Sequence, residues 1–529
     1  MKIPLTLYFQ KNLKLKYLIL LAMIIVCVLC LNGLWHAKNE LPQGKDTFSH
    51  LNKLNIAWKI LRADKHPYYY KDNKSYIHNL IFIVYDYPFF YYYASLFFYL
   101  IAFPWFGFKA VYISSAFFSC LLIIFTYKNA RILIGRDAGI LAAYLCAVAP
   151  FNITNSRNFN LETTLIATIS MTIYLFLRSH FFTNRKFSLL CALAASVSML
   201  TRATAAIPLS GIIIWFFAKT YSDRSKDNLK LKIRLKNFLL FLLAFLSITL
   251  IYYGNYDVLH NHLTRSFAAD IGSTGLLNKI QFYGKGIFAQ ALGGNYIFAA
   301  LFTLILIRSA KLLQKTAFFT ILIPLGIIIL LPKSNLSEEL EWILPVLPLV
   351  VIVLSSCLRL KNKALRNSIV SFMLLFLTLQ CTTLSFQERN SLNPWLKQIF
   401  TGKILAPQKC PAYNELFADL SSDQKSGGLK LGIIAKDKAL HFIPIFSAAA
   451  DLYRKDWKII ELTDTMSDQE NITFFDYIMV VSGEKVPPFP DDSAFSHSIK
   501  QLSLEKEYDF PSNYFEISEF VFLFKPKQK

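Results

Sequence analysis

The sequence has few charged residues for its length and no disulfide framework. Charged residues make up only 17% of the 529 residues, whereas 54% are hydrophobic and 15% aromatic. Seven of the eight cysteines lie inside apolar segments, and only Cys410 lies in a polar part of the chain. The shortage of charge, together with apolar runs along most of the chain, excludes a soluble globular protein of this size. The cysteine pattern excludes a small disulfide-stabilised scaffold.

Acidic residues are also scarce, and this scarcity gives the chain a strong positive charge. There are 34 Asp and Glu against 56 Lys and Arg, for a net charge of +22. No nucleic-acid recognition motif accompanies the charge, so a nucleic-acid partner is not expected. Most of the basic residues lie in short clusters between apolar runs, which is the pattern of cytoplasmic anchors in a multi-pass membrane protein. Lys11, Lys14 and Lys16 therefore predict a cytoplasmic N-terminus, and the first apolar run lacks an A-x-A cleavage site, so we expect a retained span.

The charge clusters predict about eleven membrane spans and an outward-facing C-terminus. A tyrosine-rich segment at 80–106 is expected to be interfacial or re-entrant, and 254–294 is expected to be a long outer loop. The expected spans are residues 17–35, 110–127, 138–154, 162–178, 187–200, 204–218, 237–253, 295–308, 316–331, 342–358 and 367–385. The prediction is thus a polytopic α-helical membrane domain over 1–386.

Composition changes near Gln387, and 387–529 is predicted to be an extracytoplasmic α/β domain. Strand-like runs occur at 429–434, 475–481 and 520–524, with a helix-like stretch at 440–454. This part has no G-x-G-x-x-G motif, so nucleotide binding is not predicted. The alternative to a catalytic role is a lid or scaffold over the membrane domain.

Several charged and aromatic residues are predicted to share the outer face of the membrane. Ionisable groups at membrane depth are costly and usually functional. These residues are Asp46, His50, Tyr85, Tyr87, Arg157, Glu162, Arg202, His260, His262 and Arg265. The set fits transfer of a sugar from a polyprenyl phosphate, in which a base removes the acceptor's proton and cations stabilise the leaving phosphate. Asp46 is the expected base, and the arginines are the expected phosphate ligands.

Other interpretations remain open for these residues. Asp46 and Glu162, with His50 as a further candidate, are alternatively ligands of a divalent metal ion. Asp46 is also a candidate N-cap for a helix that starts at Thr47, and Glu162 is suited to the start of a span. Arg202 is alternatively a snorkelling arginine, the histidines are ordinary loop residues, and the tyrosines form an interfacial belt.

The order of these motifs resembles the GT-C superfamily of integral membrane glycosyltransferases. The similar branch is that of the protein O-mannosyltransferases and lipid A aminoarabinose transferases. The resemblance spans about residues 17–385 and rests on six stretches, 46–50, 85–93, 134–137, 149–162, 199–203 and 340–348. It implies an inverting transfer from a polyprenyl-phosphate sugar, with Asp46 at the position of the family's first-loop catalytic Asp and Glu162 at that of a second Asp. Arg202 falls where the family usually has Thr-Lys.

Three positions depart from the family pattern. Glu162 replaces Asp, Tyr87 stands where aminoarabinose transferases have Lys, and Glu341 replaces the usual Arg. The expected function is therefore transfer of an unspecified sugar to a lipid-linked glycan, lipopolysaccharide or protein on the outer face of the inner (plasma) membrane. The alternatives are a transporter or flippase of lipid-linked saccharides, which predicts broken helices in both halves, and a non-catalytic envelope assembly protein.

Overall fold

The chain divides into two compact units. In this computed structural model, the structure describes 5–39, 88–223, 228–260, 276–308, 321, 323–330, 344–387, 392–402 and 404, isolated positions at 47–81, 416 and 420, and strands at 430–435, 458–461, 477–482, 502–510 and 519–526. The helical unit contains Met1–His36, Asp72–Ala94 and Tyr112–Pro407. The second unit contains Ala37–Lys71, Ser95–Val111 and Gln408–Lys529. The predicted domain boundary at 386/387 remains a prediction.

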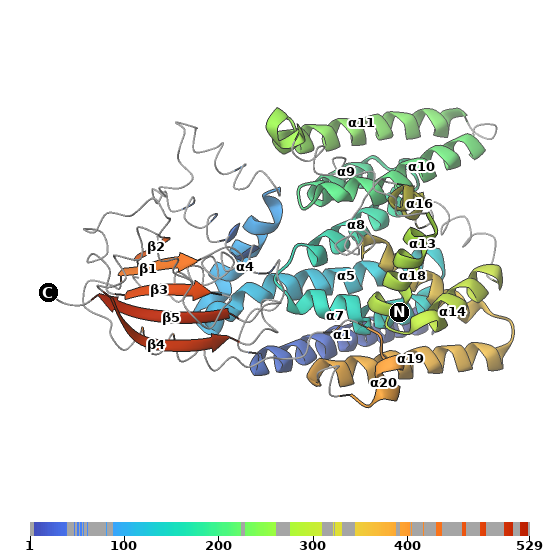
Figure 1. Cartoon of the computed structure of the whole chain (residues 1–529). Coiled ribbons are helices and arrows are strands. Elements are labelled where there is room, and N and C mark those ends of the chain that lie inside the picture. Colours follow the sequence, from blue (N-terminus) through green and yellow to red (C-terminus); the bar gives the residue numbers. More distant parts are fainter. Residues whose placement is uncertain are drawn as a thin grey trace. The chain divides into compact units, whose positions relative to one another are not determined.

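Helices fill the described part of the helical unit. They are α1 (Leu5–Lys38), the first turn of α4 (Phe90–Phe106, which belongs to the second unit from Ser95 on), α5 (Tyr112–Leu133), α6 (Arg136–Val148), α7 (Pro150–Arg157), α8 (Glu162–Arg178), α9 (Arg185–Met199), α10 (Ala206–Asp223), α11 (Asn228–Tyr253), α13 (Leu276–Lys285), α14 (Asn295–Arg308), α16 (Ile323–Leu330), α18 (Leu347–Ser355), α19 (Lys363–Phe386) and α20 (Pro394–Ile399). Helices α5, α8, α9 and α11 pack side by side in that order (Figure 1). This packing brings the start of α8 close to the end of α9.

Five of the described helices are long and apolar enough to cross a membrane. They are Leu15–Lys38, Lys109–Leu133, Ala203–Ser222, Leu229–Tyr253 and Lys363–Phe386, and the number rises to seven if each of two bent helix pairs counts as one span. Leu239, Leu243, Leu246 and Leu250 form an exposed stripe on α11, at the spacing of one helix face. Such a stripe suits contact with lipid, so the protein is a membrane protein. The predicted total of eleven spans remains a prediction.

The predicted span at 138–154 is not one straight helix. It is broken at Ala149, and α6 and α7 meet at an angle of 54°. Ala149 has extended backbone angles, φ −66° and ψ 137°, because a residue before proline avoids the helical region and Pro150 follows. Proline at the first position of a helix is favourable, so the same residue that ends α6 begins α7.

Two other expectations are corrected by the structure. The segment 254–294 was expected to be a loop, but it contains helix α13 and a π-helix at Gly286–Ala291. Tyr91 and Tyr92, expected at a membrane interface, are fully buried near the start of α4. Tyr91 packs against Phe159 with ring centroids 5.1 Å apart, so this ring contacts the protein itself, and the interfacial position of the segment remains a prediction.

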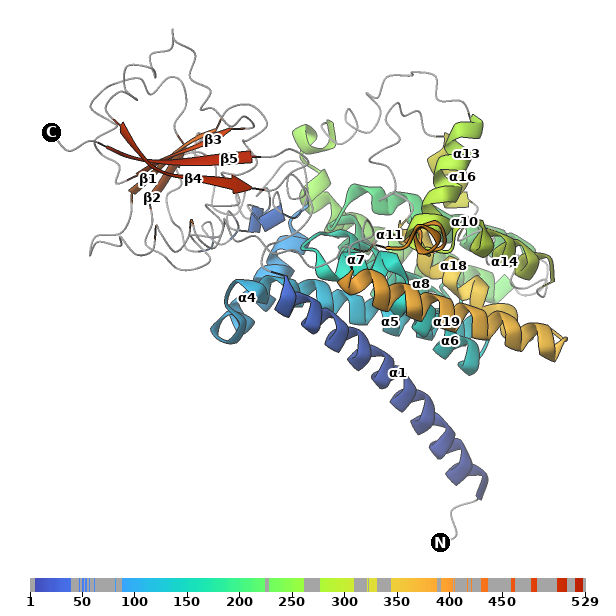
Figure 2. The same ribbon diagram turned by 60° about the horizontal axis from the view of Figure 1, so that its bottom comes forward.

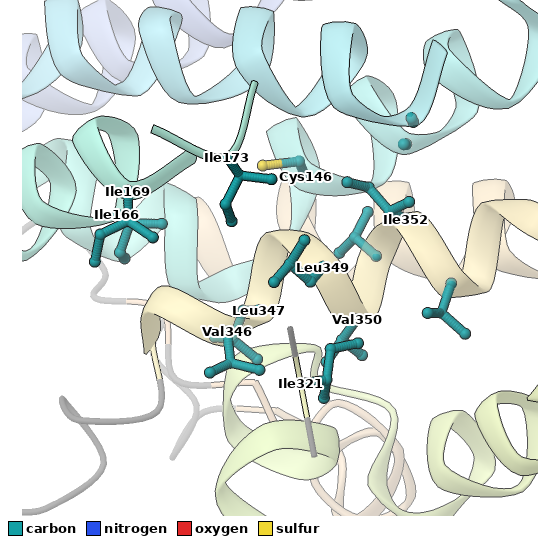
Figure 3. Packing of buried hydrophobic residues seen from close by; sticks show 14 of the residues in the cluster. Cys146, Ile166, Ile169, Ile173, Ile321, Val346, Leu347, Leu349, Val350 and Ile352 are labelled. Atoms are coloured by element: carbon teal, nitrogen blue, oxygen red, sulfur yellow. The ribbon is translucent and has the colours of Figure 1, made fainter. Parts of the chain in front are cut away.

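The core of the helical unit is centred on α18. All nine residues of this helix are buried, which is the property of a helix surrounded by others. Figure 3 shows Leu347, Leu349 and Ile352 of this region among side chains from α6 and α8, including Cys146, Ile166, Ile169 and Ile173. A smaller cluster joins Leu21 and Val28 of α1 to residues of α5, α6, α7 and α19. Helix α1 is therefore packed onto the bundle along part of its length.

The described strands of the second unit form one twisted five-stranded sheet (Figure 2). The strands are β1 (Lys430–Ala435), β2 (Lys458–Glu461), β3 (Tyr477–Ser482), β4 (Leu502–Phe510) and β5 (Glu519–Pro526), in the order β2-β1-β3-β5-β4. The three predicted strand runs correspond to β1, β3 and β5, whereas β2 and β4 were not predicted. Strands β2, β1 and β3 are parallel, a pairing that needs crossover connections. The predicted helix at 440–454 lies outside the described residues, so the α/β assignment remains a prediction.

Candidate active site

A buried ion pair joins the start of α8 to the turn between α9 and α10. Arg202 Nη1 donates to Glu162 Oε1 over 2.6 Å, and the side chains of Arg202 and Glu162 are only 16% and 6% exposed. The two residues are 40 positions apart in the sequence. The structure thus brings together one acid and one base that the charge pattern placed on the same membrane face. Close opposite charges with little access to water interact strongly, and their mutual desolvation makes the pair costly to separate.

Both ends of this ion pair are positioned by local backbone structure. Glu162 is the first residue of α8, where a carboxylate interacts favourably with the helix dipole. Helix α9 ends at Met199, and Arg202 has extended backbone angles, φ −159° and ψ 136°. The intervening turn is fixed from two sides: Phe90 N donates to Leu200 O, and Tyr253 Oη donates to Met199 O. Arg202 is therefore held by the start of α4 and the end of α11.

Helix α7, which precedes Glu162, is polar although it is buried. Asn152, Asn155, Ser156 and Arg157 are each at most 8% exposed. Polar groups in such a position need partners inside the protein. Ser119 Oγ donates to Asn152 Oδ1, and Asn152 Nδ2 donates to Ala147 O. The second bond, at 3.4 Å, joins the first turn of α7 to the last turn of α6.

Arg157 connects three helices through its guanidinium group. Its Nε donates to Asn32 Oδ1 of α1 at 3.0 Å, and its Nη2 donates to Ser385 Oγ of α19 at 2.9 Å. The guanidinium carbon lies 5.4 Å from the centroid of the Trp35 ring, within the range of a cation–π interaction. Arg157 is fully buried. Two of its three nitrogens are thus committed to the protein, which leaves only Nη1 for the predicted phosphate contact.

Four buried polar atoms between Arg157 and Thr164 have no hydrogen-bond partner among the described residues. They are Arg157 Nη1, Asn158 Oδ1, Asn160 Oδ1 and Thr164 Oγ1. The other groups of this segment are bonded: Asn160 Nδ2 donates to Asn155 Oδ1, and Thr163 Oγ1 donates to Asn155 O. Unpartnered buried polar atoms are uncommon in native proteins. Four of them in the eight-residue segment 157–164, which includes Glu162, mark this segment as a candidate binding site.

The remaining residues predicted from the sequence divide into two groups. Asp46, Tyr85, Tyr87, His262 and Arg265 lie outside the described residues. Two others are described: His50 is buried in the second unit, and His260 is exposed and stacked on Tyr256 with ring centroids 5.6 Å apart. Within the described parts of the chain, no three His, Cys, Asp or Glu residues are grouped as metal ligands. The proposed metal set of Asp46, Glu162 and His50 remains a prediction.

Sequence reasoning missed the partners of Arg157 and the unpartnered asparagines. Asn32 and Ser385 lie inside apolar spans, where single polar residues gave no signal. A signal did exist for the turn, because Asn152, Asn155, Asn158 and Asn160 place four asparagines within nine residues. That density is unusual next to a membrane span, where each amide must find a partner.

Comparison with known proteins agrees with this fold. The family model described as dolichyl-phosphate-mannose-protein mannosyltransferase matches residues 86–252. ArnT from Cupriavidus metallidurans is similar in its apo state (13% identity, 95% of this chain and 97% of that chain, TM-score 0.56). It is also similar when bound to undecaprenyl phosphate (12% identity, the same coverage, TM-score 0.58). The arabinofuranosyltransferase AftD from Mycobacteria is similar over 96% of this chain and 41% of that chain (13% identity, TM-score 0.51). No curated protein matches the chain in sequence.

The matched family segment contains α5 to α10 and with them both partners of the Glu162–Arg202 ion pair. The structural similarity to ArnT extends over nearly the whole chain. The chain therefore has the fold of these membrane glycosyltransferases, and its residues 86–252 match the mannosyltransferase family model, in agreement with the resemblance that the order of its motifs indicated.

Proposed function

We propose that this protein transfers a sugar from a polyprenyl-phosphate donor to an acceptor hydroxyl at the membrane surface. The observation that carries the proposal is the buried Glu162–Arg202 ion pair within a GT-C fold. A similar structure, that of ArnT, has been determined with undecaprenyl phosphate bound, which supports a polyprenyl phosphate as the carrier. The acceptor is a lipid-linked glycan, lipopolysaccharide or protein on the outer face of the inner (plasma) membrane.

Arg202 is assigned to the phosphate of the donor. Its guanidinium group is planar and positively charged, and its fork of five N–H donors matches the geometry of phosphate oxygens. When the bond between the sugar's anomeric carbon and the phosphate oxygen breaks, the polyprenyl phosphate takes the electron pair. The cation stabilises the charge that develops on that leaving group. Glu162 holds Arg202 in position and balances its charge before the donor binds.

Asp46 is assigned to the acceptor. Its carboxylate takes the proton of the acceptor hydroxyl while the hydroxyl oxygen forms the new bond to the anomeric carbon. A single displacement of this kind inverts the configuration at that carbon. In the sequence, Asp46 follows the end of α1 by eight residues. Tyr85, Tyr87, His262 and Arg265 are further proposed contacts of the substrates, and His260, exposed near the end of α11, is assigned with them.

Transfer assays in membranes test this function. Radiolabelled polyprenyl-phosphate mannose and glucose would be supplied to membranes containing the wild-type protein, Asp46→Asn or Arg202→Gln, and incorporation into lipid, glycan and protein fractions would be counted. We expect transfer by the wild type and a loss of at least about 100-fold in each variant, the usual size of effect for a general base or charge-stabilising group. Equal transfer by wild type and Asp46→Asn would remove Asp46 as the base.

One observation favours a second candidate, a transporter of lipid-linked saccharides. Such transporters use broken helices in both halves of the membrane domain. Two bent pairs occur here, Arg136–Val148 with Pro150–Arg157 and Leu277–Ala291 with Tyr296–Ile307. Proteoliposomes loaded with a polyprenyl-phosphate hexose distinguish the two functions. A transporter moves the intact lipid between leaflets without an acceptor, whereas a transferase releases polyprenyl phosphate only when an acceptor is present.

A further inference from the structure

The turn between α7 and α8 has the hydrogen-bonding character of a sugar-binding site. From the four unpartnered atoms, we infer that Arg157, Asn158, Asn160 and Thr164 bind hydroxyl groups of the donor's sugar, next to the Glu162–Arg202 pair. This inference rests on the proposed function and adds the part of the site that recognises the saccharide itself.

The burial of these atoms indicates that they need a partner. Thr164 and Arg157 are fully buried, and Asn158 is 8% exposed. A buried polar group without a partner costs about 1–3 kcal/mol. Four such atoms within residues 157–164 therefore destabilise the fold substantially when no ligand is bound. A ligand that satisfies them removes this burden when it binds.

The chemistry of the four atoms selects the class of ligand. Asn158 Oδ1 and Asn160 Oδ1 only accept hydrogen bonds, Arg157 Nη1 only donates, and Thr164 Oγ1 can do both. A phosphate or carboxylate is disfavoured because the two amide oxygens would face its negative oxygens. A metal cation is disfavoured because Arg157 already places a positive charge in this turn. Sugar hydroxyls satisfy the whole set, because each hydroxyl both donates and accepts.

The backbone keeps the turn rigid enough to recognise a ligand. Asn155 is bonded to both Asn160 and Thr163, so the chain after α7 folds back onto that helix. Ser115 Oγ of α5 donates to Asn158 O at 2.9 Å. Arg157 is itself anchored on Asn32 and Ser385. Side chains that are already ordered lose little conformational entropy on binding, which favours selective recognition.

Thr164→Val is the most informative variant, because valine has the shape of threonine without its hydroxyl. If Thr164 Oγ1 has no role, removing a buried unpartnered hydroxyl is neutral or raises thermal stability. If it binds a sugar hydroxyl, the same change weakens donor binding. Thr168→Val is the matched control one turn along α8, since Thr168 Oγ1 is already bonded to Thr164 O and Leu165 O. Asn158→Leu is a second variant of similar volume.

Binding would be measured in nanodiscs with undecaprenyl phosphate and with undecaprenyl-phosphate mannose, glucose and aminoarabinose. We expect Thr164→Val and Asn158→Leu to bind undecaprenyl phosphate as the wild type does, and to lose about tenfold in affinity for the glycosylated lipid that the wild type prefers, the value of one good hydrogen bond. Thr168→Val should change neither. The thermal midpoint of Thr164→Val should not fall.

Other outcomes separate this inference from the proposed function. If the wild type binds undecaprenyl phosphate but none of the three glycosylated lipids more tightly, or if both variants keep the wild-type preference, the turn does not recognise sugar and its atoms are satisfied by water. The proposed function would survive that result. If the wild type transfers sugar in no assay and binds none of the four lipids, the proposed function itself has failed.

Discussion

Arg157 and Asn32 are 125 positions apart in the chain, yet the Nε of one donates to the Oδ1 of the other over 3.0 Å inside the helical unit. This bond ties α1, which leads to Asp46, to α7, which leads to Glu162. A single buried cation therefore joins the first helix of the chain to the helix that precedes Glu162.

Arg157→Ala is expected to destabilise the protein strongly. It leaves Asn32 and Ser385 without their charged partner, and hydrogen bonds to charged groups contribute about 1.5–3 kcal/mol each. We expect a clear fall in the thermal midpoint of the protein in detergent or nanodiscs. Arg185→Ala, which removes an exposed arginine at the start of α9, is the control and should change the midpoint little. A double-mutant cycle with Asn32→Ala should give a coupling energy. If the two changes add without coupling, the observed bond contributes nothing.

Glu162 and Arg202 are expected to act as a unit. Either Glu162→Gln or Arg202→Gln should reduce kcat for sugar transfer by about 100-fold or more, and the double variant should lose little beyond the worse single one. The reason is that both changes remove the same 2.6 Å ion pair. Steady-state transfer kinetics measure this, with Lys186→Gln as a control that removes an exposed charge at the opposite end of α9 from Arg202. Fully additive losses would show that the two side chains act independently.

Removal of divalent metal ions is expected to leave the activity nearly unchanged. Glu162 is bonded to a guanidinium group, which supplies the positive charge that a metal ion would bring to the phosphate. Transfer would be measured before and after dialysis against EDTA, and we expect rates within about twofold, far below the loss of a charge-stabilising group. A loss of tenfold or more that Mg²⁺ or Mn²⁺ restores would support the alternative in which Asp46 and Glu162 hold a metal ion.

Two glycine substitutions should have opposite effects on stability. A Cβ added at Gly139 would lie 2.9 Å from Tyr127 Cδ2 and 3.1 Å from Tyr127 O, so α5 and α6 would have to separate. Gly139→Ala should therefore lower stability by about 1–3 kcal/mol. Gly33 of α1 has no atom within 4 Å of such a Cβ, and Gly33→Ala should raise stability by about 0.5–1 kcal/mol. Thermal unfolding of both variants tests the sign. A stabilising Gly139→Ala would contradict the close packing of the two helices.

The sequence predicted the uninterrupted helices well and the interrupted one poorly. Helices α9 and α19 were predicted to within a few residues, because apolar length and flanking charges define such spans. Residues 138–154 were predicted as one span that leaves the membrane at Pro150, but the bend at Ala149 was not predicted. Prolines also occur inside intact membrane helices, where neighbouring groups satisfy the freed carbonyl. Here the chain bends instead, and the amide of Asn152 donates to Ala147 O across the bend, a bond that only the three-dimensional structure shows.

The same distinction applies to the site. The positions of the basic clusters between the predicted spans placed Glu162 and Arg202 on the same membrane face, and the structure shows that the two side chains form an ion pair. Arg157 was assigned to the same phosphate because an arginine on the outer face is usually functional. Its burial among Asn32, Trp35 and Ser385 was not predictable, because these partners come from α1 and α19, which are far apart in the sequence. Pairing between distant spans leaves no local pattern in the chain.

The bond between Arg157 and Ser385 also bears on how the protein is made. Ser385 lies 228 residues after Arg157, near the end of α19, so the ribosome completes α7 long before its partner helix exists. During that interval a polar half-helix with a cationic side chain is incompletely satisfied in or near the membrane. We expect the early helices to remain within a protected environment, such as the insertion machinery, until α19 arrives. Truncation before α19 should therefore produce chains that membrane quality-control proteases remove quickly.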